Sequence, residues 1–133
     1  MMEIVLHRHS PEEIRYAGFD LFESSAPGRA CLTLKQAHRE LVALGLHPRL
    51  VPGDLASGLL RTANTLPQTD LIVISGMDHA LLESAWFYFP RMLHENSLVM
   101  IESGNVRPEF QALNLQQVKE LARRSASSVR RAA

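Results

Sequence analysis

The sequence has only one cysteine, Cys31, and no excess of charge of either sign. A single cysteine excludes an internal disulfide framework and leaves no cysteine-rich zinc site. The 14 Lys and Arg residues balance the 14 Asp and Glu residues. Nucleic-acid-binding domains usually carry an overall basic excess, so we expect no nucleic-acid partner from this composition.

Long apolar runs are also missing, since none approaches the roughly 20 residues that cross a bilayer. Glu3 interrupts a very short apolar stretch at the N-terminus, which excludes the layout of a signal peptide. We therefore expect a cytoplasmic protein with no membrane partner. A chain of 133 residues is long enough for one domain but short for a complete doubly wound enzyme. We assign residues 1–122 to one domain and expect a basic, disordered tail in residues 123–133.

What the sequence does contain is a near-continuous apolar run from Leu71 to Ile74, followed by the small-residue turn Ser75–Gly76. A run without polar alternation predicts a strand buried on both faces, as in a parallel sheet covered by helices. Ligands of such sheets bind beyond the carboxyl ends of the strands, where Asp78 and His79 follow the turn. Any chemistry is expected at this point of the chain.

Strands and helices are predicted to alternate along the chain. Thr33 and Gln36 form a capping box at the start of a helix that Gly45 ends. Asp54 is expected to cap a helix to about residue 66, with Leu55, Leu59, Leu60 and Ala63 on its buried side. Strands are predicted at 15–22, 49–51, 70–75 and 98–102, and helices at 33–44, 54–66, 80–93 and 115–124. Pro90 is expected to kink or end the helix at 80–93 early. Alternation of this kind predicts an α/β fold with a mostly parallel sheet.

Five short pieces appear in a fixed order within roughly residues 3 to 103. They are Gly18–Glu23, Gly45–Leu46, Val51–Asp54, Ser75–His79 and Leu98–Glu102. Together they resemble the class I S-adenosylmethionine-dependent methyltransferases, in particular the small-molecule O-methyltransferases related to macrocin O-methyltransferase. No single motif is specific, and the ordered set carries the resemblance. It implies a Rossmann-like sheet with helices on both faces.

The resemblance also implies roles for residues at the strand ends. Asp20 would accept hydrogen bonds from the cofactor ribose, and His79 would remove the proton of the acceptor hydroxyl. Mg²⁺, where a metal is used, would bind Asp78 and Glu102. The implied cofactor-binding residues are Asp20, Phe22, Gly53, Asp54, Ser75 and Gly76. The implied function is methyl transfer from S-adenosylmethionine to a hydroxyl of a small molecule.

The sequence departs from this family where its first strand and glycine-rich loop are expected. In the family that strand lies between the strand ending at Asp20 and the strand ending at Ser75, so the sheet would have a gap. Ile4–Leu6 or a second copy of the chain could fill the gap, and we expect instead a fragment of a longer protein, truncated before the glycine-rich motif. The alternative function is a non-catalytic, methyltransferase-like domain acting as a homo-oligomer or an interaction module.

Overall fold

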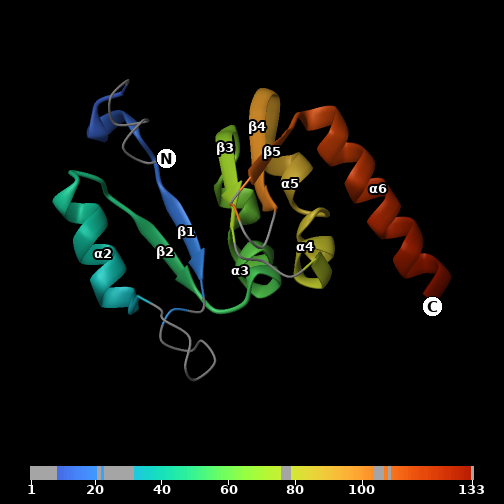
Figure 1. Cartoon of the computed structure of the whole chain (residues 1–133), viewed down its shortest axis with the longest axis horizontal. Coiled ribbons are helices and arrows are strands. Elements are labelled where there is room, and N and C mark those ends of the chain that lie inside the picture. Colours follow the sequence, from blue (N-terminus) through green and yellow to red (C-terminus); the bar gives the residue numbers. More distant parts are fainter. Residues whose placement is uncertain are drawn as a thin grey trace. The chain divides into compact units, whose positions relative to one another are not determined.

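The computed structural model of the chain describes residues 9–20, 22, 32–75, 79–103, 107 and 109–132. The chain forms two compact units, which divide between Gly58 and Leu59 (Figure 1). Both units contain strands and helices, so the predicted α/β class is confirmed. The strands form two separate sheets, one in each unit. No helix in the part of the chain that the structure describes is long and apolar enough to cross a membrane.

The sheet of the first unit consists of two parallel strands. Strand β1 (Ala17–Asp20) pairs with β2 (Arg49–Pro52), and Asp20 lies opposite Pro52 at the end of the ladder. Both strands are confirmed where the sequence predicts them. Because the strands are parallel, their carboxyl ends lie at the same edge of the sheet.

Helix α2 (Leu34–Ala43) follows the local signals of the sequence closely. The Thr33 hydroxyl accepts a hydrogen bond from the Gln36 amide, and the Gln36 side chain accepts one from the Thr33 amide, both at 3.1 Å. Gly45 ends the helix with a φ of +86°, a conformation that favours glycine. The predicted capping box and helix stop are therefore both confirmed. A one-turn 3-10 helix, η1 (Pro11–Glu13), precedes β1.

Helix α3 (Leu55–Thr62) begins in the first unit and continues into the second, where the 3-10 helix η3 (Ala63–Thr65) extends it. Leu59 and Ala63 are buried as predicted, but Leu60 is 70% exposed, so its predicted burial is wrong. Successive helical residues are rotated by about 100°, which turns Leu60 away from the side that carries Leu59.

The sheet of the second unit has three strands in the order β3 (Thr69–Ile74), β4 (Leu93–Ser103) and β5 (Glu109–Leu113). Strands β3 and β4 are parallel, whereas β5 runs antiparallel to β4. The prediction of a mostly parallel sheet is therefore wrong for this unit, whose sheet is mixed. Only residues 104–108 join β4 to β5, which is too short for the crossover that a parallel strand requires.

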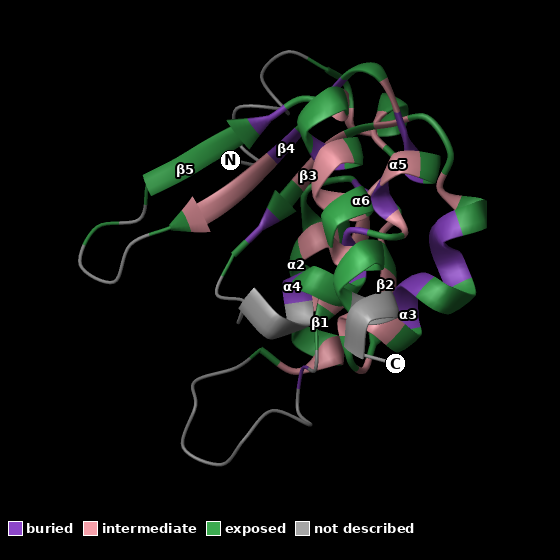
Figure 2. Cartoon of the chain, turned by 90° about the vertical axis from the view of Figure 1, so that its right-hand side faces the viewer, coloured by how far each residue is buried: buried purple, intermediate pink, exposed green. Residues whose placement is uncertain are grey.

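Only one face of this sheet is well buried, and β5 is exposed along most of its length (Figure 2). Val99 is fully buried and Ile74 is nearly so, whereas Val73 and Leu98, which alternate with them, are 42% and 46% exposed. Phe110 of β5 is also 42% exposed and belongs to the same open face, since it pairs with Glu102. Burial of β3 on both faces is therefore a wrong prediction. Its partner β4 contacts helices α5 (Phe89–Met92) and α6 (Leu115–Ala132), which pack on the unit.

The aromatic segment of the second unit is not a continuous helix. Helix α4 (His79–Ala85) ends before Pro90, which lies in the first turn of α5. The rings of Trp86 and Phe89 are both buried and meet edge to face with centroids 5.5 Å apart. Phe87 is 56% exposed, so its ring contributes little to this core.

Helix α6 begins after a capping box that the sequence analysis missed. Asn114 and Gln117 exchange hydrogen bonds of 2.9 Å between the side chain of each and the amide of the other. The helix continues past Arg124 to Ala132, so residues 123–132 are helical where a disordered tail is expected. Its Val118 is fully buried, which anchors the first half of the helix in the second unit.

Candidate functional site

The carboxyl ends of β1 and β2 bring together three of the predicted cofactor-binding residues. Asp20 ends β1, and the amide of Gly53 donates a hydrogen bond of 3.0 Å to the Asp20 carbonyl oxygen. Asp54 follows Gly53 directly and begins the approach to helix α3. The Asp20 side chain is exposed at this edge. Two acidic residues, Asp20 and Asp54, are therefore found where the two parallel strands end, at the same edge of the sheet.

Asp54 acts as the predicted helix cap. Its Oδ1 accepts a hydrogen bond of 2.9 Å from the Ser57 amide. This bond, together with one from the Ser57 side chain, lowers the pKa of the Asp54 carboxyl below its usual value of 3.8. The group is fully exposed, so water reaches the carboxylate and its charge is retained at neutral pH.

Gly53 has a φ of +114°, a backbone conformation that residues other than glycine rarely adopt. A Cβ built at this position would meet no atom within 4 Å. The glycine is thus required by the backbone conformation of the turn and not by crowding. Within the described residues, the space directly beside Gly53 is therefore unfilled.

Phe22, predicted to lie near the cofactor, is buried with only 5% of its surface exposed. Its φ of +50° places it in the left-handed region just after β1. The burial of its ring gives Phe22 a packing role in the first unit.

The predicted catalytic and metal-binding residues belong to the second unit. Ser75 follows Ile74, and Glu102 follows Ile101, the residue with which Ile74 pairs. Ser75 and Glu102 therefore occupy neighbouring positions at the carboxyl ends of two parallel strands. Ser75 is exposed and Glu102 is half-buried.

Three further residues, Gly76, Asp78 and His79, are predicted at the carboxyl ends of these strands. Gly76 and Asp78 lie outside the described residues, and His79 is described only as the first residue of helix α4. Within the described residues, no three His, Cys, Asp or Glu side chains come together as metal ligands.

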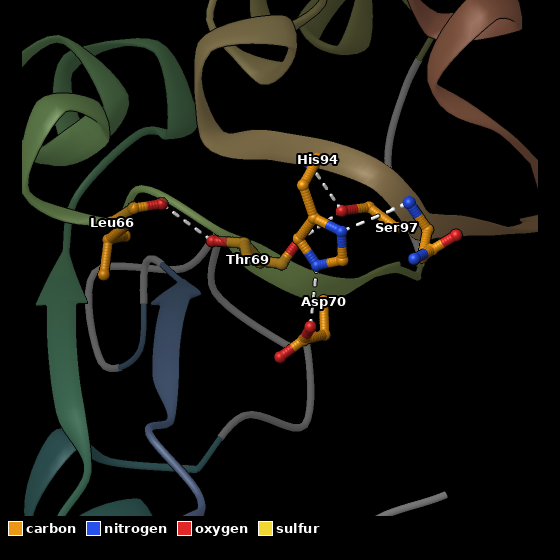
Figure 3. Close-up of polar contacts among 6 residues, drawn as sticks. Leu66, Thr69, Asp70, His94 and Ser97 are labelled. Carbon is orange, nitrogen blue, oxygen red and sulfur yellow. Dashed lines mark hydrogen bonds and ion pairs between the residues drawn. The ribbon is translucent and has the colours of Figure 1, made fainter.

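A polar cluster that sequence reasoning missed lies at the opposite, amino-terminal ends of β3 and β4 (Figure 3). The His94 Nε2 and the Asp70 Oδ1 are 2.7 Å apart. The Asn96 amide donates a hydrogen bond of 3.2 Å to His94 Nδ1, which assigns the ring proton to Nε2 and makes Asp70 the acceptor. No spacing in the sequence signals this pair, since 24 residues separate its members.

This cluster lies at an irregularity in the pairing of β3 with β4. Thr69 pairs with Leu93 but Leu71 pairs with Leu98, so β4 contains three more residues than β3 between these two points. Both ring nitrogens of His94 have hydrogen-bond partners, which fixes the orientation of the ring. We interpret the cluster as a structural support of the bulge.

Searches against protein-family models, curated proteins and solved structures find no match to this chain. The fold and the two sets of strand-end residues define an α/β protein with candidate ligand-binding positions beyond its parallel strands.

Proposed function

We propose that the chain is part of an S-adenosylmethionine-dependent methyltransferase that acts on a hydroxyl of a small molecule. The observation that carries the proposal is the hydrogen bond from Gly53, the residue before Asp54, to Asp20 at the carboxyl ends of β1 and β2. The resemblance assigns cofactor binding to these three residues. Their placement at one edge of one sheet supports that assignment.

The residues of this edge suit a nucleoside in chemical terms. S-adenosylmethionine, when bound, would supply the activated methyl group. The exposed Asp20 carboxylate would accept hydrogen bonds from two ribose hydroxyls. The open space at Gly53 leaves room for the adenine beside the strand ends. Asp54 stays ionised because its pKa is lowered, so it presents a second acceptor.

The acceptor hydroxyl would lose its proton to His79, since an imidazole is the side chain that most often serves as a general base. Methyl transfer is an in-line displacement, so alignment of the acceptor oxygen is the main demand on the protein. Mg²⁺ on Asp78 and Glu102 stays a prediction of the resemblance. The described residues gather no set of three ligands, so no step is assigned to a metal.

The proposal is tested by melting the chain with and without millimolar S-adenosylmethionine, with isothermal calorimetry as a direct measure of binding. A ligand that binds only the folded state raises the free energy of unfolding, by about 2.7 kcal/mol at a hundredfold excess over Kd, and therefore raises the melting temperature. Asp20→Asn should abolish the rise. Glu40→Gln, which removes one exposed carboxylate from α2, should leave it unchanged. A cooperative unfolding transition whose melting temperature is the same with and without the cofactor would contradict the proposal.

The alternative is a non-catalytic interaction module or homo-oligomer that keeps the scaffold. The open apolar face of the second unit, with Val73, Leu98 and Phe110 each more than two-fifths exposed, favours it. Under this alternative S-adenosylmethionine would leave the melting temperature unchanged. The sedimentation coefficient in sedimentation velocity would increase with protein concentration.

A further inference from the structure

Helix α6 concentrates the positive charge of a chain whose net charge is zero. It carries five basic residues and one acidic residue, Glu120. The overall balance that argues against a nucleic-acid partner is an average that conceals this helix. The charge of one surface, and not that of the whole chain, decides whether a polyanion binds there.

The basic residues recur along one side of the helix. With about 100° between successive residues, Lys119, Arg123 and Arg124 fall within less than half of the circumference. The opposite side carries Val118, which is fully buried in the second unit. We call residues 119, 123 and 124 the basic stripe.

The arginines of this stripe are accessible. The Arg123 and Arg124 side chains are 75% and 74% exposed. Each pairs with Glu120, at 3.3 and 3.4 Å. Exposed pairs of this kind contribute about 0–1 kcal/mol, so an incoming phosphate can replace the carboxylate at small cost. Ser127 and Ser128 line a shallow hollow of about 450 Å³ with these three residues, and their hydroxyls can donate to phosphate oxygens.

We propose that the basic stripe of α6 binds the phosphate backbone of a nucleic acid. A membrane surface is the less favoured partner, because interfacial helices insert Trp, Phe or Leu side chains into the lipid. Beyond Ala122 the sequence of α6 contains only serine, alanine, valine and arginine. The contact is electrostatic and independent of base sequence, and it does not depend on the proposed methyl transfer.

The test measures the anisotropy of a labelled DNA duplex and of a labelled single-stranded RNA with the full chain, between about 50 and 200 mM salt. Arg123→Ala with Arg124→Ala should reduce the slope of log K against log salt by about 2. The matched control, Lys35→Ala with Arg39→Ala, removes the same charge from exposed positions of α2 and should bind like the parent chain. Glu120→Gln should bind more tightly, because it removes the carboxylate that competes with phosphate.

Alanine is the best helix former, so the double variant keeps α6 helical, and circular dichroism checks this directly. Three results would overturn the proposal. They are no binding of either nucleic acid at the lowest salt, an equal loss in the α2 control, or binding to phosphatidylserine vesicles without binding to nucleic acid.

Discussion

The Ser97 hydroxyl donates a hydrogen bond of 2.7 Å to the carbonyl oxygen of Thr69, the first residue of β3, and so joins β4 to the start of β3. The Ser97 hydroxyl oxygen in turn accepts a hydrogen bond of 2.8 Å from the His94 amide. Ser97 is 2% exposed, which prevents water from replacing either bond. One small side chain therefore satisfies two backbone groups at the irregular point of the ladder.

Replacing Ser97 by alanine should lower the free energy of unfolding by about 1–3 kcal/mol, because two backbone groups lose their partner in a buried place. Urea titration followed by circular dichroism measures the change. Ser103→Ala is the matched control, since Ser103 is exposed and its bond to the Glu109 carbonyl is long, at 3.3 Å. It should change the stability by less than about 0.5 kcal/mol. Equal effects of the two substitutions would contradict the role assigned to Ser97.

The cap at Asp54 predicts a pH dependence of the stability. Its pKa is lowered in the folded state from the usual 3.8, so the ionised form stabilises the fold. The contribution is fully present above pH 3.8 and is lost as the pH falls through the lower folded value. Asp54→Asn retains a capping oxygen without the titration.

Melting temperatures of the parent chain and of Asp54→Asn, measured across this acidic range, provide the test. The stability advantage of the parent should shrink steadily as the carboxylate becomes protonated. A difference that stays constant down to low pH would show that the Asp54 charge does not contribute to stability.

Trp86 and Phe87 are neighbours in sequence but should respond very differently to truncation. Trp86 is 5% exposed and packs edge to face on Phe89, so Trp86→Ala should cost about 3–5 kcal/mol. Phe87 is 56% exposed and its ring contacts Tyr88 and Arg91, so Phe87→Ala should cost less than about 1 kcal/mol. Urea titration of both variants gives the comparison. A large loss for Phe87→Ala would show that a partner covers this ring in solution.

Signals confined to a few neighbouring residues predicted the local structure well. The capping box of Thr33 and Gln36, the stop at Gly45 and the cap at Asp54 all form as expected. Each depends on a hydrogen bond or a backbone conformation within one helical turn, which the sequence specifies directly. The proximity of Asp20 to Gly53 follows once the two strands are parallel, because their carboxyl ends then coincide.

Features that depend on distant residues could not be predicted in this way. The pair of His94 with Asp70 forms only because β3 and β4 lie side by side with a three-residue excess in β4. Strand β5 was missed because its residues become a strand by pairing with β4, and its own five-residue pattern is too short to predict a strand. The apolar run of β3 gave no information about how many helices would cover it.

The sequence by itself determined the capping box at Thr33, the helix stop at Gly45 and the cap at Asp54, and it located the segments that form β1 to β4. Those properties arise from side chains bonding to their own backbone. The tertiary structure decided which strands pair, that β5 returns antiparallel, and which face of the second sheet is left open. These outcomes depend on the competition of distant segments for the same backbone donors and apolar surface, and no local pattern encodes the result of that competition.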